Sequence, residues 1–590
     1  MRDLLTLLPY LKRYKKALVM GVLCTSVSTT LAMLVPFMVG RVIDDLLRET
    51  SWRTLTNYGV LIISLSLISG LMLFLQRRFL TGMAIHIEAD LHHDLYAHLQ
   101  HQTLSFFQSH RTGDLMAHMI NDVIAVRQLT GPLIMYSLRM GFIVVITLIL
   151  MLHISVRTTL LLFVTTPFIS LTVKYLGHQV HTRFRRIQEF FSDMSARVQE
   201  NFSAARLVRA YAQENAEAAT FDALNRRYTQ LNLGLVRRSA LMQPVIQLFI
   251  QISYLLIIFY GSILVVRGTI TIGQFAELNL YLTALVWALI VLGDLINLYQ
   301  RGTASLKRLN TILNIKPAIR DRTNVKPQAS VSGQIEFRNL DFSYGEDSAP
   351  VLHNINLTIK AGQTVAIVGP TASGKSTLIN LLPRLLESPP NSILIDGVSI
   401  QDYPLIQLRS SIGYVPQETL LFSGTIAENI AFGNETANLA DIEWAAEIAG
   451  MTEDVRGFPE GFETLVGERG ITLSGGQKQR TAIARAILRQ AQILILDDAL
   501  SSVDTYTEKK ILDGLREVMR NRTCIIVSHR TSTTREADMI CVLDGGRIVE
   551  QGSHDELLAR YGTYAALHRR QLLQEELIAE LGPEAEREQV

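Results

Sequence analysis

The stretch GPTASGKST, residues 369–377, decides how the second half of this chain folds. It has the pattern G-x-x-x-x-G-K-[ST] and lies between an apolar run, TVAIVG, and an apolar helical run, TLINLLPRLL. Such glycines let backbone N–H groups converge on phosphate oxygens, and the dipole of the following helix adds positive potential. The pattern predicts an ATP-binding α/β domain whose phosphate loop consists of Gly369, Pro370, Thr371, Ala372, Ser373, Gly374, Lys375, Ser376 and Thr377.

Two of these loop residues have specific expected roles. Lys375 reaches the β and γ phosphates, and Ser376 supplies a hydroxyl to Mg²⁺. A second stretch, ILILD at 493–497, predicts a buried strand that delivers Asp497 beside the loop, where it holds Mg²⁺ through water. The sequence therefore predicts ATP and Mg²⁺ as cofactors.

A third stretch, LSGGQKQR at 473–480, indicates which kind of nucleotide-binding domain this is. A serine and two glycines before a helix make another anion-binding helix N-terminus. One phosphate loop suffices to bind one ATP. A second phosphate-binding turn therefore indicates contact with a different nucleotide molecule. With these stretches the chain resembles the ATP-binding cassette (ABC) family, in which LSGGQ is the signature that closes on ATP held by the partner. The resemblance implies a dimer of chains and ATP contacts for Ser474, Gly475, Gly476 and Gln477.

The resemblance extends across the whole cassette and implies further roles. Tyr344 in FSYGED resembles the aromatic residue that stacks on adenine, and Gln417 in YVPQ resembles the residue that links Mg²⁺ to the membrane domain. Asp504 in SSVD resembles the turn that crosses the dimer interface, and His529 in IIVSHR the switch histidine near the γ-phosphate. LVGERG, residues 465–470, resembles the exporter-specific loop that contacts the partner's cytoplasmic helices.

The first 300 residues have a different composition, with long apolar runs in a chain that is 48% hydrophobic. A membrane span needs about 20 mostly apolar residues. Lys and Arg lie in the N-terminal tail and directly after the second, fourth and sixth runs, which predicts a cytoplasmic N-terminus. The N-terminal run is interpreted as a retained span, not a signal peptide. The six predicted spans are roughly 17–40, 57–76, 132–152, 158–175, 243–266 and 276–298.

Two long polar connections, between spans two and three and between spans four and five, predict helices that continue into the cytosol. Within them, residues 106–123 and 199–214 resemble the coupling segments of ABC exporters. The expected fold class is an α-helical transmembrane domain of the ABC exporter type, followed by an α/β P-loop nucleotide-binding domain. The expected boundaries are 1–315 for the transmembrane domain, 316–334 for a linker, 335–575 for the cassette and 576–590 for a polar tail.

Charged residues in or near the spans allow more than one interpretation. Intramembrane charge usually faces a bundle interior or a water-filled cavity. For Asp294 two interpretations stay open, an ion pair with a basic residue and a place in a substrate cavity. Arg139 is expected to be paired or to snorkel rather than to bind substrate. Glu277, near the outer end of span six, is expected to be solvated.

Other sequence features narrow the possible classes of protein. A net charge of +2 gives no indication of a general nucleic-acid binder. The cysteines Cys24, Cys524 and Cys541 fit neither a zinc site nor a disulfide framework, and are expected to be small apolar residues. Six spans contradict a soluble cassette protein, and an importer is disfavoured because importers usually have separate membrane and ATPase chains.

Asp498 departs from the family pattern. There the corresponding residue is usually a glutamate that acts as the base for hydrolysis, and aspartate is one methylene shorter. A misplacement of about 1 Å costs about 10²-fold in rate, so Asp498 predicts an impaired base at the chain's own site. The alternative is that the backbone adjusts, so that the aspartate carboxylate reaches the position from which it orients the attacking water.

The leading hypothesis is an ATP-driven exporter of amphipathic drugs, lipids or peptides in the cytoplasmic membrane of a bacterium. Because the signature is intact while the base is short, the chain resembles the degenerate-site subunit of a heterodimer whose partner carries glutamate. The alternatives are a homodimeric lipid or drug flippase, and a regulatory or channel-like subunit with little hydrolysis of its own.

Overall fold

The structure is a computed structural model that describes residues 2–48, 51–322, 325, 327–328, 330–345, 348–467, 470, 472–528 and 530–581. The chain forms two compact units. One consists of residues 1–100 and 112–315, and the other of residues 101–111 and 316–590.

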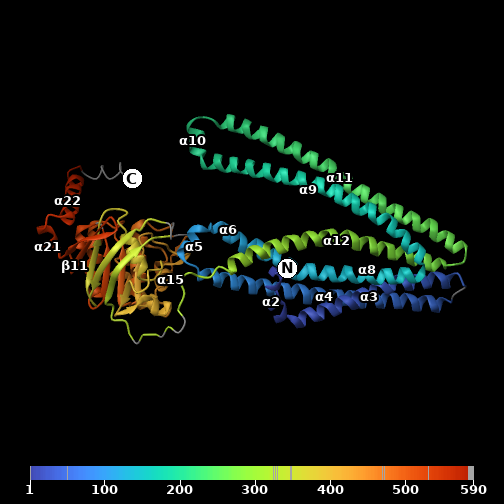
Figure 1. Cartoon of the computed structure of the whole chain (residues 1–590), viewed down its shortest axis with the longest axis horizontal. Coiled ribbons are helices and arrows are strands. Elements are labelled where there is room, and N and C mark those ends of the chain that lie inside the picture. Colours follow the sequence, from blue (N-terminus) through green and yellow to red (C-terminus); the bar gives the residue numbers. More distant parts are fainter. Residues whose placement is uncertain are drawn as a thin grey trace. The chain divides into compact units, whose positions relative to one another are not determined.

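The first unit is built from long helices (Figure 1). A bundle is formed by α3 (Lys15–Leu46), α4 (Trp52–Gln100), α8 (Ile134–Ile154) and α12 (Ile272–Leu313). Two further helices, α9 (Val156–Ser203) and α11 (Glu214–Val266), pack along each other, with α10 (Ala205–Ala210) at the turn between them. The shorter helical elements are α1 (Arg2–Leu5), α2 (Leu8–Arg13), α6 (Thr112–Ala117), η1 (His118–Asp122), α7 (Val123–Gln128) and η2 (Leu129–Leu133).

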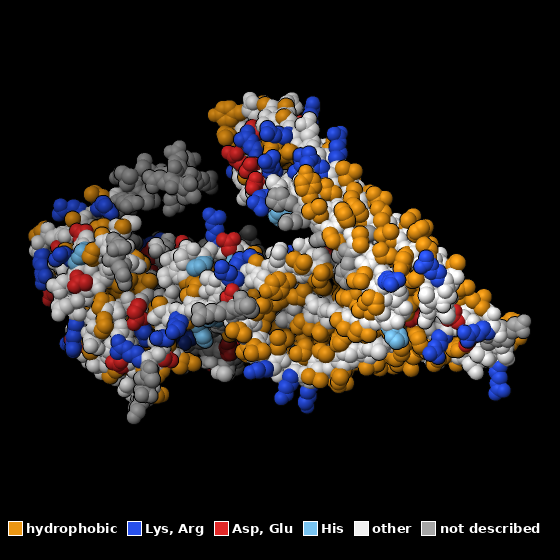
Figure 2. Space-filling view, turned by 45° about the vertical axis from the view of Figure 1, so that its right-hand side comes forward, with side chains coloured by type: hydrophobic (Ala, Val, Ile, Leu, Met, Phe, Trp, Pro, Cys, Tyr) orange, Lys and Arg blue, Asp and Glu red, His pale blue; other side chains and the backbone are white. Residues whose placement is uncertain are grey.

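Five helical stretches of the described residues are long and apolar enough to cross a membrane, and they contain five of the six predicted spans. They are Lys15–Leu46, Trp52–Gln100, Thr112–Ile154, Glu214–Val266 and Ile272–Leu313. The remaining predicted span, 158–175, lies inside α9. The structure describes the helix there but not all of its side chains. Large apolar side chains are exposed over these helices, as a lipid-facing surface requires (Figure 2).

The helices extend beyond their apolar stretches, as the long polar connections predict. The helix α4 continues to Gln100, α9 continues to Ser203 and α11 begins at Glu214. One stretch departs from regular helix: η1 and η2 are π-helical, and η2 contains Pro132. Proline has no N–H to donate, so a local change of hydrogen-bond register accommodates it.

The second unit has the α/β fold expected of a nucleotide-binding domain. Its main sheet has the strand order β12-β11-β3-β10-β9-β6, and a second sheet has the order β2-β1-β4-β5. The strands are β1 (Ile335–Phe342), β2 (Leu352–Ile359), β3 (Thr364–Val368), β4 (Ile393–Ile395), β5 (Val398–Ser399), β6 (Ile412–Val415), β7 (Gly424–Thr425), β8 (Leu465–Val466), β9 (Ile493–Asp497), β10 (Thr523–Val527), β11 (Met539–Asp544) and β12 (Arg547–Gly552).

Two large hydrophobic clusters hold the unit together, and a smaller third cluster contains Leu557 and Tyr564. The first cluster packs the signature helix, α18, against its neighbours, and the second holds the helix after the phosphate loop, α13, against both sheets. The helices are α5 (Leu104–Ser109), α13 (Lys375–Leu381), η3 (Ile400–Asp402), α14 (Leu405–Ser410), α15 (Ile426–Ala431), α16 (Leu439–Ile448), α17 (Thr452–Gly457), η4 (Gly461–Glu463), α18 (Gly475–Leu488), α19 (Thr505–Met519), α20 (Thr531–Thr534), α21 (His554–Ala559) and α22 (Thr563–Leu581).

The short helix α5 belongs to this second unit, although it lies between two segments of the helical unit in the sequence. Its Phe106 is buried, and the ring stacks on His110 with centroids 4.2 Å apart. Residues 106–111 of the predicted coupling segment 106–123 thus group with the cassette, and residues 112–123 group with the helical unit.

Candidate ATP site

The carboxyl ends of four parallel strands meet at one edge of the main sheet. The strand β10 pairs in parallel with β3 and β9, and β6 pairs in parallel with β9. The phosphate loop follows β3, Asp497 ends β9 and Gln417 lies two residues beyond β6. Ligands of open α/β sheets bind at this edge. His529 follows β10 in the sequence but lies outside the described residues.

The phosphate loop has a backbone that only small residues permit. Gly369 has φ +155°, and a Cβ there would lie 2.0 Å from the Leu543 carbonyl oxygen. Gly374 has φ +98°, and Ala372 is left-handed with φ +63°. Left-handed backbone is sterically open mainly to glycine. The sequence therefore builds a tight loop before α13, whose free N–H groups suit an anion.

Lys375 folds back over the loop that precedes it. Its Nζ donates to the carbonyl oxygens of Gly369, at 2.9 Å, and Pro370, at 2.7 Å. Burial lowers the pKa of Lys375, and the charges of Asp497 and Asp498 oppose that shift. An ammonium held in the loop supplies the positive charge that phosphate groups need.

The magnesium ligands predicted from the sequence fit a hard cation. Asp497 is 2% exposed, and its Oδ1 has no hydrogen-bond partner. Burial raises the pKa of Asp497, while a hydrogen bond from Ser376 and the charge of Lys375 oppose the shift. A buried carboxylate oxygen without a partner is costly, and oxygen donors are what Mg²⁺ prefers. Ser376 and Asp497 therefore come together as a donor pair for this ion.

Tyr344 and Gln417 differ in how the protein holds them. The Tyr344 hydroxyl lies 2.9 Å from Thr377 Oγ1, and its ring meets Phe342 edge-on. The Tyr344 side chain is 57% exposed, which leaves a ring face free beside the first turn of α13. Gln417 is exposed on the loop after β6. Of the remaining loop residues, Ser373 is buried, whereas Thr371 is exposed and Pro370 is half-buried.

The signature residues begin α18 and are organised by a capping box. Ser474 Oγ accepts from the Gln477 N–H at 3.3 Å, and Gln477 Oε1 accepts from the Ser474 N–H at 2.9 Å. Gly475 and Gly476 lie against Ser502, where a Cβ on Gly476 would be 3.0 Å from a carbonyl oxygen. Within the described part of the chain, no hydrogen bond joins residues 474–477 to residues 369–377. The signature is therefore not bonded to the phosphate loop of its own chain.

Asp504, which is expected at the dimer interface, has a structural role within its own chain. It is the N-cap of α19, and its Oδ1 accepts from the Thr507 N–H at 2.9 Å. That backbone hydrogen bond is the main reason why the pKa of Asp504 is lowered.

Two residues that sequence reasoning missed, Gln479 and Arg530, both bond to residues 501–503, in the turn that follows β9 and Asp498. Gln479 of α18 donates to Ser501 Oγ at 2.8 Å and accepts from the Ser502 N–H at 2.9 Å. Arg530 donates to the carbonyl oxygens of Ser501 and Val503, each at 3.0 Å. Arg530 also binds Glu508, which is 2% exposed. The spacing of polar residues gave no signal for these contacts, because they join segments that only the fold brings together.

The backbone of Asp498 is fixed from both sides. Its φ is +48°, its N–H donates to the Val527 carbonyl oxygen at 2.9 Å, and its carbonyl oxygen accepts from Ser501 at 3.2 Å. Asp497, directly before it, pairs with Val527 in the parallel ladder. A shift of the backbone toward the nucleotide would break these bonds.

A separate cavity of about 990 Å³ opens within the helical unit. Arg139, Arg301, Asp294 and Trp287 line it, together with Arg185 of α9. Within the described residues, neither Arg139 nor Asp294 has an ion pair, and both line this cavity, which favours the cavity interpretation of Asp294. The expectation that Arg139 is paired or snorkels stays a prediction. Glu277 is 5% exposed, so the expectation that it is solvated is wrong, because α12 packs against α3 at this level.

Comparisons with known proteins agree with this arrangement. Residues 18–289 match the ABC transporter transmembrane region, and residues 352–501 match the ABC transporter domain. The probable multidrug resistance ABC transporter ATP-binding/permease protein YheI of Bacillus subtilis (strain 168) is 37% identical over 92% of this chain and 93% of its own. The ATP-dependent lipid A-core flippase of Syntrophus aciditrophicus (strain SB) is 35% identical over 97% of this chain and 94% of its own.

Other similar proteins have the same full-length correspondence. The multidrug resistance-like ATP-binding protein MdlA of Escherichia coli (strain K12) is 35% identical over 92% of both chains. Among solved structures, that of a bacterial Atm1-family ABC exporter with ATP bound is 27% identical and has a TM-score of 0.78, covering 95% of this chain and 98% of that one.

Proposed function

This chain belongs to the ABC exporter family as a half-transporter, and we propose that it exports amphipathic compounds as one half of a heterodimer. Its relatives include multidrug resistance proteins and lipid A-core flippases, which supports drugs and lipids as substrates, and amphipathic peptides are a further class. The proposed domains are 1–315 for the membrane, 316–334 for the linker, 335–575 for the cassette and 576–590 for the tail, with the cassette in the cytoplasm of a bacterium.

The proposed ATP site uses the residues gathered at the sheet edge. The phosphate loop and Lys375 hold the phosphates, Tyr344 supports the adenine, and Ser376, Asp497 and Gln417 are the candidates for holding Mg²⁺, which neutralises developing charge on the phosphates. Asp498 and His529 are the residues proposed to orient water and contact the γ-phosphate. The signature residues 474–477, with Asp504, serve the nucleotide on the partner chain.

The observation that carries the asymmetry is the fixed backbone of Asp498. Its N–H and carbonyl groups are both bonded, which supports the proposal that no backbone shift compensates for the shorter side chain. The carboxylate then stays about one C–C bond short of the position that a glutamate would reach, and about 1 Å costs about 10²-fold. We therefore assign slow hydrolysis to this chain's own site and faster hydrolysis to the site that its signature completes on a partner with glutamate.

The transport step follows from differential binding. ATP closes the two cassettes because it binds the closed state more tightly than the open state. The difference between these two affinities sets how far the population of membrane-domain conformations can shift. The residues that pass this closure on are proposed to be the coupling segments 106–123 and 199–214. The cavity lined by Arg139 and Asp294 is the proposed substrate space.

The test is transport by the assembled transporter in lipid vesicles. The probes are a fluorescent DNA dye, Hoechst 33342, and a phospholipid with a fluorescent nitrobenzoxadiazole headgroup. We expect ATP-dependent movement of at least one probe, lost in a complex that carries Gly475→Asp. ATP-gated flux that continues without hydrolysis would instead support the regulatory or channel-like function. Transport by a complex of this chain alone would support the homodimeric flippase.

A further inference from the structure

The segment between the membrane helices and the cassette is fastened to the cassette surface. It follows α12 and would be a flexible tether if its polar side chains faced only water. Instead, Ile319 is 7% exposed and Val331 packs against the second hydrophobic cluster. Farther along, the N–H groups of Ser332 and Gln334 donate to Asp396, and Gln328 and Gln407 exchange two hydrogen bonds.

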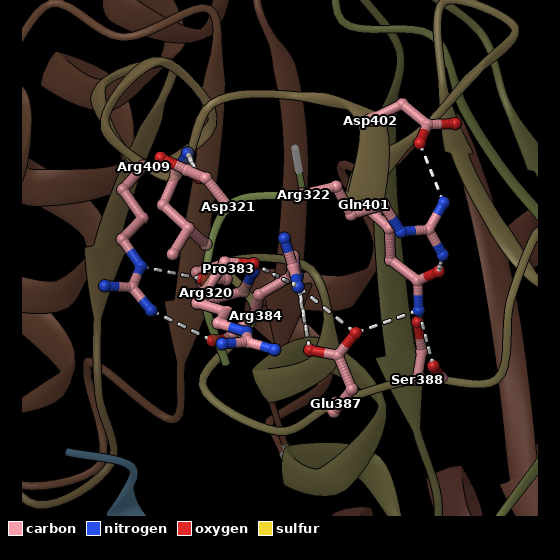
Figure 3. A network of polar contacts seen from close by, with 11 residues as sticks. Arg320, Asp321, Arg322, Pro383, Arg384, Glu387, Ser388, Gln401, Asp402 and Arg409 are labelled. Atoms are coloured by element: carbon pink, nitrogen blue, oxygen red, sulfur yellow. Dashed lines mark hydrogen bonds and ion pairs between the residues drawn. The ribbon is translucent and has the colours of Figure 1, made fainter. Parts of the chain in front are cut away.

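Arg322 bonds the N-terminal part of this segment to the cassette (Figure 3). Its guanidinium donates to Asp402 at 2.8 Å and to Gln401 Oε1. Directly before it, Asp321 accepts from the N–H of Leu405, the first residue of α14. An ion pair that is half-exposed counts for little by itself, but the bond to Gln401 leads into the interior.

Gln401 passes the contact to buried groups. It is 3% exposed, and its Nε2 donates to Glu387 Oε1 at 2.9 Å and to the Ser388 carbonyl oxygen at 2.8 Å. Glu387 in turn accepts from Arg384, which is 3% exposed. Gln401 and Arg384 are buried, whereas Glu387 between them is exposed. Hydrogen bonds with a charged partner are stronger than those between neutral groups, so the chain of contacts fixes the positions of these side chains.

Arg384 lies close to the C-terminal end of the phosphate-loop helix, α13. It follows α13, the helix that begins at Lys375 of the phosphate loop, by three residues. Its backbone is left-handed, with φ +50°, and its carbonyl oxygen accepts from Arg409 at 3.0 Å. The network therefore runs from Arg322 to the loop that ends the phosphate-loop helix.

We propose that Arg322 is a positioning residue for coupling: through Gln401, Glu387 and Arg384 it holds the linker of this chain to the end of its own phosphate-loop helix. Only residues 316–320 separate the helical unit from Asp321. Five residues span at most about 17 Å when fully extended, so there is little slack to absorb a displacement of α12. The linker thereby transmits movement within one chain, in addition to the coupling segments. This inference rests on the proposed exporter function.

The test uses the assembled transporter in lipid vesicles, with a fluorescent label at Arg267→Cys, an exposed position after α11. The three cysteines of this chain are all buried, so within this chain the label reacts with the introduced cysteine, and the same preparation without Arg267→Cys gives the background from the partner. The readouts are basal ATPase activity and the change in iodide quenching of the label on adding ATP and vanadate. The variants are R322A, R322K and, as a matched control, R338A, which breaks an exposed ion pair with Glu336 on β1.

We expect R322A to keep basal ATPase activity while the quenching response shrinks roughly 2- to 30-fold. R322K keeps the charge beside Asp402 and recovers part of the response, and R338A behaves like the unmodified chain. An R322A response equal to that of the unmodified chain would overturn the linker proposal alone. Equal losses of ATPase activity and response in R322A would also overturn it, because they indicate a merely structural role. An unmodified chain without any response would instead refute the proposed exporter function.

Discussion

At the scale of single residues, the proposed slow hydrolysis depends on the one methylene by which Asp498 is shorter than glutamate. Asp498 lies in a left-handed turn with its backbone bonded to Val527 and Ser501, so side-chain length decides where its carboxylate ends. Asp497, its neighbour, is buried, and its Oδ1 has no hydrogen-bond partner among the described residues, which suits the proposed Mg²⁺ ligand. The proposal therefore separates ATP and Mg²⁺ binding, which it leaves intact, from hydrolysis, which it slows.

Asp498→Glu is expected to speed hydrolysis at this chain's own site. In a complex that carries Gly475→Asp, the partner's site is disabled and the remaining turnover reports on this chain's phosphate loop. Restoring the carboxylate position should raise that turnover by roughly 10- to 100-fold. Asp498→Asn in the same background should change it little. Steady-state ATPase measurements decide this, and a large loss in the asparagine variant would show that Asp498 already works as a base.

Gly369→Ala is expected to weaken ATP binding at the same site. A Cβ at this position would lie 2.0 Å from the Leu543 carbonyl oxygen, in a backbone that side chains rarely adopt. Strain of this kind costs about 1–3 kcal/mol, which the loop relieves by moving. Binding of a fluorescent ATP analogue measures the loss. The control is Gly457→Ala, because a Cβ there meets nothing within 4 Å; equal binding by both variants would contradict the role of the loop geometry.

At the scale of elements, the signature is both a helix cap and a proposed phosphate contact, and the two roles can be separated. Ser474 caps α18 through a reciprocal pair of hydrogen bonds with Gln477. Ser474→Ala should lose the cap, worth about 1 kcal/mol, and should lower partner-site ATPase activity. Ser474→Asp keeps a good cap but adds negative charge toward phosphate.

We therefore expect the two Ser474 variants to lower ATPase activity alike, while only the alanine variant lowers the midpoint of thermal unfolding. Unfolding and ATPase assays on the same preparations measure the two effects. Full ATPase activity in the aspartate variant would show that the N-terminus of α18 does not meet phosphate.

The elements also show what the sequence could and could not predict. The apolar runs predicted the long helices, because a membrane span must be long and apolar, and the phosphate loop predicted the strand and helix around it. The π-helical stretch around Pro132 and the burial of Glu277 depend on packing between helices that are distant in sequence. The same is true of the contacts of Gln479 and Arg530, which no local pattern marks.

Charge placement in the membrane unit was the least predictable feature. Hydropathy places Arg139 and Asp294 within or near spans, but it gives no partner for either. In the structure both line the same cavity, because α8 and α12 pack together there. A carboxylate and a guanidinium can share a cavity wall without pairing, and sequence spacing does not distinguish that case from an ion pair.

At the scale of the whole molecule, the proposed function has the chain contribute unequal halves to two ATP sites. Lys375→Ala should weaken ATP binding at the chain's own slow site and leave most turnover in place. Gly475→Asp should remove most turnover, because the signature completes the partner's faster site. ATPase assays of the two complexes provide the comparison, and equal losses from both substitutions would argue against an asymmetric transporter.

The identity of the partner distinguishes a heterodimer from a homodimer. The chain, tagged and extracted gently from its native membrane, should co-purify with an equal amount of a second half-transporter, identified by mass, that carries glutamate where this chain has Asp498. The contradicting result is a complex made only of this chain whose ATPase activity is lost in Asp498→Asn, since aspartate would then be sufficient as the base for hydrolysis.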